Sequence, residues 1–76
     1  MSNKKEMRVQ VSISRMKTYL YGKIAYHEAN LFVYLNNPVG IGEHPDIMEA
    51  FESELGKLAE YQEKLQTLEN LNVEIW

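Results

Sequence analysis

The sequence predicts a small α+β protein that is mainly α: a β-α-α-β unit in which an antiparallel helical hairpin carries short N- and C-terminal strands. Two stretches near the chain ends alternate apolar and polar residues with a period of two, which is typical of strands. Two longer stretches between them repeat apolar residues at spacings of three and four, which is typical of helices. The segment between the helical stretches, residues 36–46, holds both prolines and two of the four glycines, and it predicts a turn.

The first predicted strand covers residues 7–13. Met7, Val9, Val11 and Ile13 alternate with polar side chains, and the last three are β-branched, as strand residues often are. We expect residues 1–6 to form a flexible basic N-terminus. Residues 7–76 then make a single helical-hairpin domain with terminal strands.

The first predicted helix runs from Ser14 to residue 35, roughly six turns. Ser14 is placed to cap its first turn, and the Asn-Asn-Pro sequence at 36–38 forbids its continuation. His27 lies on the apolar stripe, where we expect a hydrogen-bonded core histidine rather than a proton-transfer group. The residues of this stripe are Met16, Leu20, Ile24, His27, Leu31 and Leu35.

The second predicted helix begins at Pro45, whose fixed backbone angle suits the first helical position, and it ends near Asn70. Beyond it, Leu71, Val73 and Ile75 alternate with polar residues and predict a short second strand. Because a short connection makes the two helices antiparallel, both strands lie at the same end of the hairpin and can pair. The apolar stripe of this helix consists of Ile47, Phe51, Leu55, Leu58, Tyr61 or Gln62, Leu65 and Leu68.

The small size of the chain predicts a homo-oligomer. A lone core in 76 residues barely offsets chain entropy, and the absence of cysteine excludes disulfides and thiolate metal sites. Two histidines without a third ligand nearby predict no metal site, and no cofactor is expected. We expect a homodimer or higher oligomer, most simply a four-helix bundle, against the alternative of a monomer with exposed tyrosines. The bundle would cover the side chains that point away from the first stripe, which are Tyr19, Tyr21, Tyr26, Phe32, Val33 and Tyr34.

Charge is distributed unevenly along the chain. Residues 1–27 carry six basic side chains and one acidic one, whereas the rest of the chain is dominated by glutamate and aspartate. Complementary halves favour contact within one chain or across a dimer, and the acidic half disfavours a nucleic acid polymer as partner. No signal sequence or membrane-spanning run is evident, so we expect a cytoplasmic protein that does not bind membranes.

The loop carries a resemblance to known proteins. The string LNNPVGIGEHPDI, residues 35–47, and the flanking helical segments, together residues 31–68, resemble a group of small proteins of tailed bacteriophages. The similarity covers about half of the chain, and the loop string is its specific part. The resemblance implies a phage or prophage origin and a cytoplasmic role in an infected bacterial host cell, and it implies no catalytic residue.

The sequence favours a protein that is not an enzyme. It has neither a cysteine nucleophile nor a Gly-x-Ser-x-Gly segment, and His44 is too close in sequence to Glu43 and Asp46 to face them readily. The glycines of the loop either serve only the turn or let an anion approach the backbone amides. The sequence leaves both interpretations open.

The expected function is that of a non-catalytic, oligomeric binder of a nucleotide signal, which sequesters a messenger of bacterial immunity and so acts in anti-defence. The basis is an analogy of size and setting. The alternative is a protein–protein interaction module, such as a host-factor inhibitor or a phage assembly or adaptor protein, in which the loop is purely structural. The expected ligand-binding residues are Gly40, Gly42, His44, Tyr26, Tyr34, Arg15 and Lys23.

Overall fold

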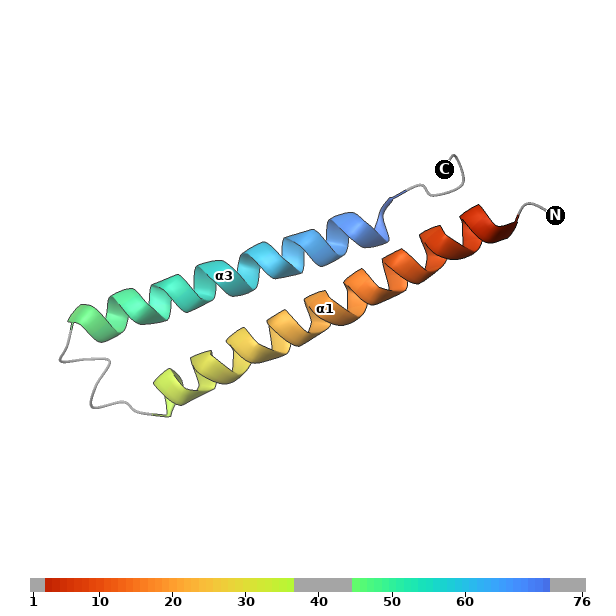
Figure 1. Cartoon of the computed structure of the whole chain (residues 1–76). Helices are drawn as coiled ribbons and strands as arrows, with labels where there is room; N and C mark the ends of the chain where they lie inside the picture. The colour runs from red at the N-terminus through yellow and green to blue at the C-terminus, as the bar shows by residue number, and fades with distance from the viewer. Residues whose placement is uncertain (1–2, 37–44, 72–76) are drawn as a thin grey trace.

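The computed structural model describes residues 3–36 and 45–71, and in these two ranges the chain is a pair of antiparallel helices (Figure 1). Helix α1 spans Asn3–Leu35 and helix α3 spans Pro45–Glu69. The molecule is a rod with extents of 63 × 15 × 13 Å. The predicted helical hairpin is confirmed.

The predicted α+β class is wrong, because the described ranges are all-α. Residues 7–13, expected as a strand, belong to α1. Their alternation also suits a helix: Val9 and Ile13 are four residues apart and half-buried on one face, whereas Met7 and Val11 are four apart and exposed on another. The second expected strand began at Leu71, which has no strand structure, and its residues 72–76 lie outside the described part of the chain.

The boundaries of the helices agree with the sequence except at the start of α1, since α3 also ends as predicted, at Glu69 next to Asn70. The end of α1 at Leu35 and the start of α3 at Pro45 are both as predicted. The other end of α1 differs, because the helix already begins at Asn3, inside the segment 1–6 expected to precede the fold. Ser14 is therefore an interior helical residue rather than a cap, and its carbonyl accepts a hydrogen bond from the Thr18 hydroxyl at 3.1 Å.

The two helices meet along a narrow seam. Its positions alternate in steps of four and three residues, the seven-residue repeat of a coiled coil, and every one of them is buried or half-buried. The α1 seam residues are Ile13, Lys17, Leu20, Ile24, His27, Leu31 and Tyr34. The α3 seam residues are Ile47, Phe51, Glu54, Leu58, Tyr61, Leu65 and Leu68.

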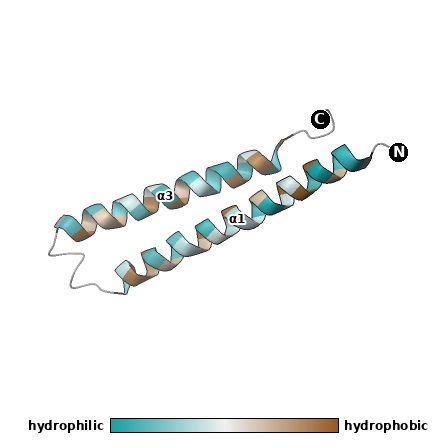
Figure 2. Cartoon of the chain, in the orientation of Figure 1, coloured by the Kyte–Doolittle hydropathy of each residue, from teal (hydrophilic) through white to brown (hydrophobic). Residues whose placement is uncertain are grey.

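The seam differs from the predicted stripes at three apolar positions. Met16, Leu35 and Leu55 were expected to be buried, but all three are exposed. Tyr34 and Glu54, the neighbours of Leu35 and Leu55, take up seam positions instead. In Figure 2 the apolar stretches alternate with hydrophilic ones along both helices.

Helix α1 is longer than its partner, with 33 residues against 25. Its N-terminal turns extend past the end of α3 in Figure 1. Tyr34 packs edge-on against Phe51 with ring centroids 6.0 Å apart, which fixes the register near the other end of the hairpin. We call that end, where Leu35 and Pro45 lie, the loop end.

Candidate functional site

A polar pair lies in the middle of the seam. His27 is only 4% exposed, and its Nδ1 is 2.5 Å from Oε2 of Glu54. Because an ionised carboxylate only accepts, Nδ1–H of His27 is the donor. This hydrogen bond is the main cause that lowers the pKa of Glu54 below its ordinary value, and it outweighs the opposing effect of burial. Asn30 and the charge of Lys57 also lower the pKa of Glu54.

The pair restricts how the two helices can slide past each other. A shift of one turn would bring an apolar side chain to each partner and leave the half-buried Glu54 carboxylate without this donor. Leaving a hydrogen-bonding group without its partner costs about 1–3 kcal/mol. His27 and Glu54 therefore specify the register of the hairpin, as single polar positions do in coiled coils.

Tyrosine rings surround the histidine on one side of the seam. The Tyr61 ring stacks on the His27 ring, with centroids 5.6 Å apart and planes within 12°. Tyr26 meets His27 edge-on at 5.0 Å, and Tyr19 meets Tyr61 edge-on at 6.4 Å. This side of the hairpin thus has an aromatic surface made by both helices.

Two lysines complete that surface. Nζ of Lys23 lies 5.6 Å from the Tyr26 ring centroid and 5.5 Å from the Tyr61 centroid, and Nζ of Lys64 lies 5.1 Å from Tyr61. These are cation–π distances, so the tyrosine rings hold both ammonium groups. We call Tyr19, Lys23, Tyr26, Tyr61 and Lys64 the tyrosine–lysine side.

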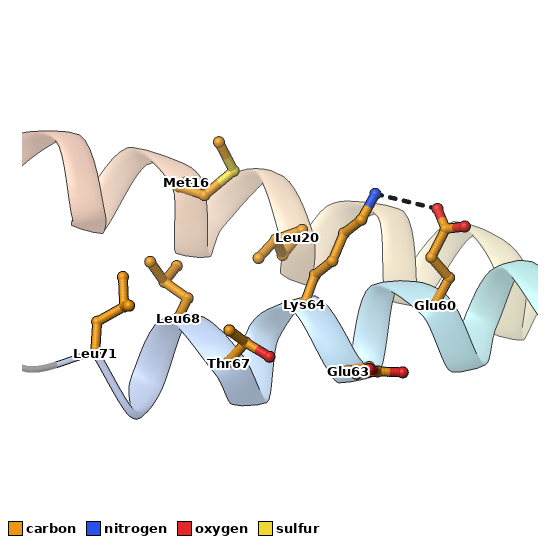
Figure 3. Close-up of a pocket in the computed structure, with 8 residues that line it drawn as sticks. All are labelled: Met16, Leu20, Glu60, Glu63, Lys64, Thr67, Leu68 and Leu71. Carbon is orange, nitrogen blue, oxygen red and sulfur yellow. Dashed lines mark hydrogen bonds and ion pairs between the residues drawn. The ribbon is translucent and has the colours of Figure 1, made fainter.

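A hollow of about 460 Å³ continues the tyrosine–lysine side away from the loop end (Figure 3). In Figure 3, Leu68 and Leu71 point toward α1, where Met16 and Leu20 lie, and Lys64 reaches toward Glu60. The Lys64 and Glu60 side chains form an ion pair at 3.1 Å, which raises the pKa of Lys64. The eight lining residues are Met16, Leu20, Glu60, Glu63, Lys64, Thr67, Leu68 and Leu71.

The charge of this hollow does not suit a phosphate. Its single lysine is already paired, and Glu63 adds a second carboxylate to that of Glu60. Met16 and Leu71 are both more than one-third exposed, so the hollow is open to water. An anion there would lose its hydration for contacts that are mostly apolar or repulsive.

The opposite side of the hairpin carries a second apolar surface. Tyr21 and Leu35 each follow a seam residue of α1, and Met48 and Leu55 likewise follow seam residues of α3. Because the repeat and the chain direction are fixed, these positions flank the same side of an antiparallel pair. Phe32 lies on this flank of α1, one turn before Leu35. We call Tyr21, Phe32, Leu35, Met48 and Leu55 the apolar side, and each of them is at least half exposed.

Charged residues are fewer on the apolar side of α3 than on its other flank. The flank of α3 on that side presents Met48, Glu52, Leu55, Ala59, Gln62, Gln66 and Glu69, two of which are charged. The other flank of α3 presents Asp46, Lys57, Glu60 and Lys64. The hairpin is therefore asymmetric, with one side more charged and the other more apolar.

The expected ligand-binding residues are only partly brought together. Lys23 and Tyr26 are in contact on the tyrosine–lysine side. Tyr34 lies in the seam against Phe51, and Arg15 lies with Lys4 and Arg8 along the N-terminal part of α1. Arg15 and Tyr34 are separated by about 28 Å along the helix axis. The other three expected residues, Gly40, Gly42 and His44, lie outside the described part of the chain.

The sequence interpretation identified His27 as a hydrogen-bonded core histidine, which is confirmed, but it missed the partner. The sequence does not predict a seam position for Glu54, because the adjacent Leu55 is more hydrophobic and suits a buried position better. A signal was present: Ile47, Glu54, Tyr61 and Leu68 recur at intervals of seven residues. That spacing places Glu54 on the same stripe as three apolar or aromatic side chains.

Residues 3–36 and 45–71 contain no group of three or more side chains arranged to hold a metal ion. Neither α1 nor α3 is apolar enough over a sufficient length to cross a membrane.

The chain matches no protein-family description, no curated protein and no solved structure. The resemblance of residues 31–68 to small tailed-bacteriophage proteins thus stays a prediction from the sequence. The function proposed below is therefore inferred from the geometry of the two sides of the hairpin.

Proposed function

We propose that this chain is a non-catalytic protein-interaction module whose apolar side binds the helical surface of a partner. The apolar side carries this proposal. It is built from both helices, it carries fewer charges on α3 than the opposite flank does, and the hairpin leaves it uncovered in the described ranges. Contiguous exposed apolar surfaces of this kind mark interaction sites.

The shallow core of the hairpin supports the same conclusion. Among the described residues, only Leu20, Leu31 and Leu58 are buried apolar side chains, and none is fully buried. A single seam between two helices stabilises a chain of this size poorly, and a partner helix on the apolar side would add a second seam. Binding and folding are then linked, because a partner that binds only the folded hairpin stabilises it.

The polar groups of the seam support a structural rather than a catalytic role. The His27 Nδ1 proton is bonded to Glu54, and the ring stacks against Tyr61. A general base must lie within hydrogen-bonding distance of a substrate proton, whereas the His27 side chain is almost completely buried. The proposal therefore keeps the expectation of no catalysis.

The binding of a nucleotide signal remains a prediction from the sequence, together with a phage origin and an anti-defence role. The loop residues on which it depends lie outside the described ranges. On the described part, Lys23 is held by two tyrosine rings, and the nearby hollow has an excess of carboxylates. These observations favour the interaction module, the other expectation from the sequence.

Site-specific photocrosslinking in cells tests the proposal. A photoreactive phenylalanine analogue replaces Phe32 on the apolar side or, as a matched control, Tyr26 on the tyrosine–lysine side. The two positions are on the same helix, both are aromatic, and they are similarly exposed at 63% and 58%. We expect a discrete crosslinked product from position 32 only, and loss of that product when Leu55→Ser is added. Equal products from both positions, or none from either, would contradict the proposal.

A further inference from the structure

We infer that the outer face of α1 binds the surface of a lipid bilayer that contains anionic phospholipids. The outer face is the side of α1 that points directly away from α3, and we define it by Lys4, Arg8, Val11, Arg15, Tyr26 and Val33. None of these residues belongs to the apolar side. The inference therefore goes beyond the proposed function and does not rest on it.

The seam identifies which residues form this outer face. Arg15 lies midway between the seam residues Ile13 and Lys17, so its side chain is on the far side of the helix from α3. The other members are separated from Arg15 by nearly whole turns of the helix, about 3.6 residues each, and all six side chains are exposed. The outer face is thus a straight line along the back of α1.

The outer face is basic. Glu6 and Glu28 are the acidic residues of α1, and they lie in line with the seam and on the flank of the apolar side, respectively. Lys4, Arg8 and Arg15 lie on the outer face without a carboxylate among them in the described part of α1. This face of the helix therefore attracts anions, although the chain as a whole has a net charge of -3.

The basic end of the outer face also has apolar side chains. Lys4, Arg8 and Arg15 border a hollow of about 520 Å³, and Met7 and Val11 supply the apolar part of its lining. Met7 is 61% exposed and Val11 is 43% exposed. Basic groups beside exposed apolar ones suit a phospholipid surface, where phosphates lie next to the acyl chains.

The acidic residues of the hairpin face the opposite way. The positions of α3 that point away from its seam carry four glutamates and, in the described range, no basic side chain. With α1 on a bilayer, the axis of α3 lies about 8–10 Å further from the surface, and these carboxylates lie further still. Charges are largely screened beyond about 8 Å at physiological ionic strength, so α3 repels the surface only weakly. The four residues are Glu49, Glu52, Glu60 and Glu63.

The remainder of the outer face favours a bilayer over a nucleic acid. Its basic side chains cover only about 17 Å, from Lys4 to Arg15, and the face then continues without charge for about 27 Å to Val33. Tyr26 and Val33 on this part are 58% and 68% exposed. Tyrosine and aliphatic side chains suit the interfacial zone of a bilayer. A nucleic acid has phosphates along its whole length and would need cations there.

The expectation that the protein does not bind membranes was based on the lack of a membrane-spanning run. A helix that lies on the surface of a bilayer needs no such run, because only one of its faces contacts lipid. In this hairpin α3 covers the opposite face of α1, and the outer face is left for the bilayer.

Vesicle flotation with the full chain tests the inference. The vesicles contain equal parts of phosphatidylcholine and phosphatidylglycerol, or phosphatidylcholine alone. We expect the wild type to float only with the anionic vesicles and to be released by about 1 M salt. Arg8→Gln/Arg15→Gln should lower the partition coefficient roughly tenfold or more, since each basic side chain near an anionic surface contributes about fivefold.

Lys57→Gln/Lys64→Gln is the matched control. It removes the same charge from the chain, but both lysines are on α3 and away from the outer face of α1. We expect it to change the partition coefficient by less than about twofold. An equal loss for the two double variants would overturn the inference, as would a wild type that does not float with anionic vesicles or floats equally with neutral ones.

An environment-sensitive dye shows which face contacts the lipid. The chain has no cysteine, so Val33→Cys places one dye on the outer face of α1, and Gly56→Cys places one on the opposite face of the hairpin, where a side chain meets open space. We expect anionic vesicles to shift the emission of the dye to the blue at position 33 only. Equal shifts at both positions, or retention of the chain by double-stranded DNA rather than by vesicles, would overturn the inference. Photocrosslinking at position 32 tests the proposed function separately.

Discussion

His27 and Glu54 form a side-chain hydrogen bond between the two helices, and both side chains occupy seam positions. A coiled-coil seam usually has apolar side chains at such positions. The polar pair therefore lowers the free energy gained from apolar burial, but it defines the register of the helices. Tyr61 covers the histidine ring, and Lys23 and Lys64 in turn lie over Tyr61. The register of the hairpin and the surface of the tyrosine–lysine side therefore depend on the same contact.

Removing one member of this pair should destabilise the hairpin. We expect His27→Ala to lower the free energy of unfolding by about 1–3 kcal/mol, because Glu54 then lacks its donor. Urea unfolding followed by circular dichroism measures the change. The double variant His27→Leu/Glu54→Leu is the control, and we expect it to recover most of the loss. If His27→Ala is as stable as the wild type, the pair does not hold the register.

Acid should weaken the same contact. The folded state lowers the pKa of Glu54, so its contribution is complete above the ordinary glutamate value, about 4.3, and is lost as the pH falls through the lower value of the folded state. The measurement is the difference in the free energy of unfolding between wild type and Glu54→Gln as a function of pH. We expect this difference to be constant from pH 5 to 6, approximately, and to shrink in stronger acid. A difference that grows on acidification contradicts the assigned hydrogen bond.

Polar substitutions on the apolar side should weaken association without unfolding the protomer. We expect Phe32→Ser and Leu55→Ser each to raise the dissociation constant roughly tenfold or more, since central apolar anchors of an interface cost about 2 kcal/mol when lost. Val33→Ser is the matched control. Val33 is next to Phe32 and similarly exposed, but it is seven residues from Tyr26 and so lies on the other side. Analytical ultracentrifugation over a concentration series gives the constants, and equal effects at positions 32 and 33 would argue against the apolar side.

Gly22 should be replaceable by alanine with a gain in stability. A β-carbon at this position meets no heavy atom within 4 Å, and the residue is in the interior of α1. Alanine is the better helix former there by about 0.5–1 kcal/mol. Thermal unfolding should show a higher midpoint for Gly22→Ala, with Gly56→Ala in α3 as a second open position. A loss of association in Gly22→Ala would show that a partner approaches this face of α1 closely.

The loop-end boundaries could be predicted because local chemistry decides them. Pro45 suits a first helical position, and the residue before a proline avoids helical backbone angles. A few neighbouring residues therefore determine where the helices end and begin. These signals do not depend on what the helices pack against.

The N-terminal half of α1 could not be predicted in the same way. Val9, Val11 and Ile13 favour strands, but Lys4, Lys5 and Glu6 before them and the long helix after them favour continuation of α1. A strand also needs a neighbour to pair with, and propensity does not say whether one is present. The prediction that Leu55 rather than Glu54 lies in the seam is wrong for a related reason. Hydrophobicity favours Leu55, whereas the seven-residue spacing favours Glu54.

The candidate surface was predictable in part. The expectation that Tyr21 and Phe32 lie away from the seam is confirmed, since both are exposed. Whether Tyr21 and Phe32 share one surface with Met48 and Leu55 depends on the antiparallel register of the two helices. The His27–Glu54 and Tyr34–Phe51 contacts fix this register, and each joins residues that are distant in sequence. No local pattern in the sequence contains that information.

The central claim is that the apolar side is an interface, and because the sequence predicts self-association, light scattering during size-exclusion chromatography tests it most directly. One chain has a mass of 8.9 kDa, so we expect the wild type to elute with twice this mass. The Phe32→Ser/Leu55→Ser variant should elute at the mass of a single chain. A wild type that stays at 8.9 kDa at every concentration measured would contradict the account.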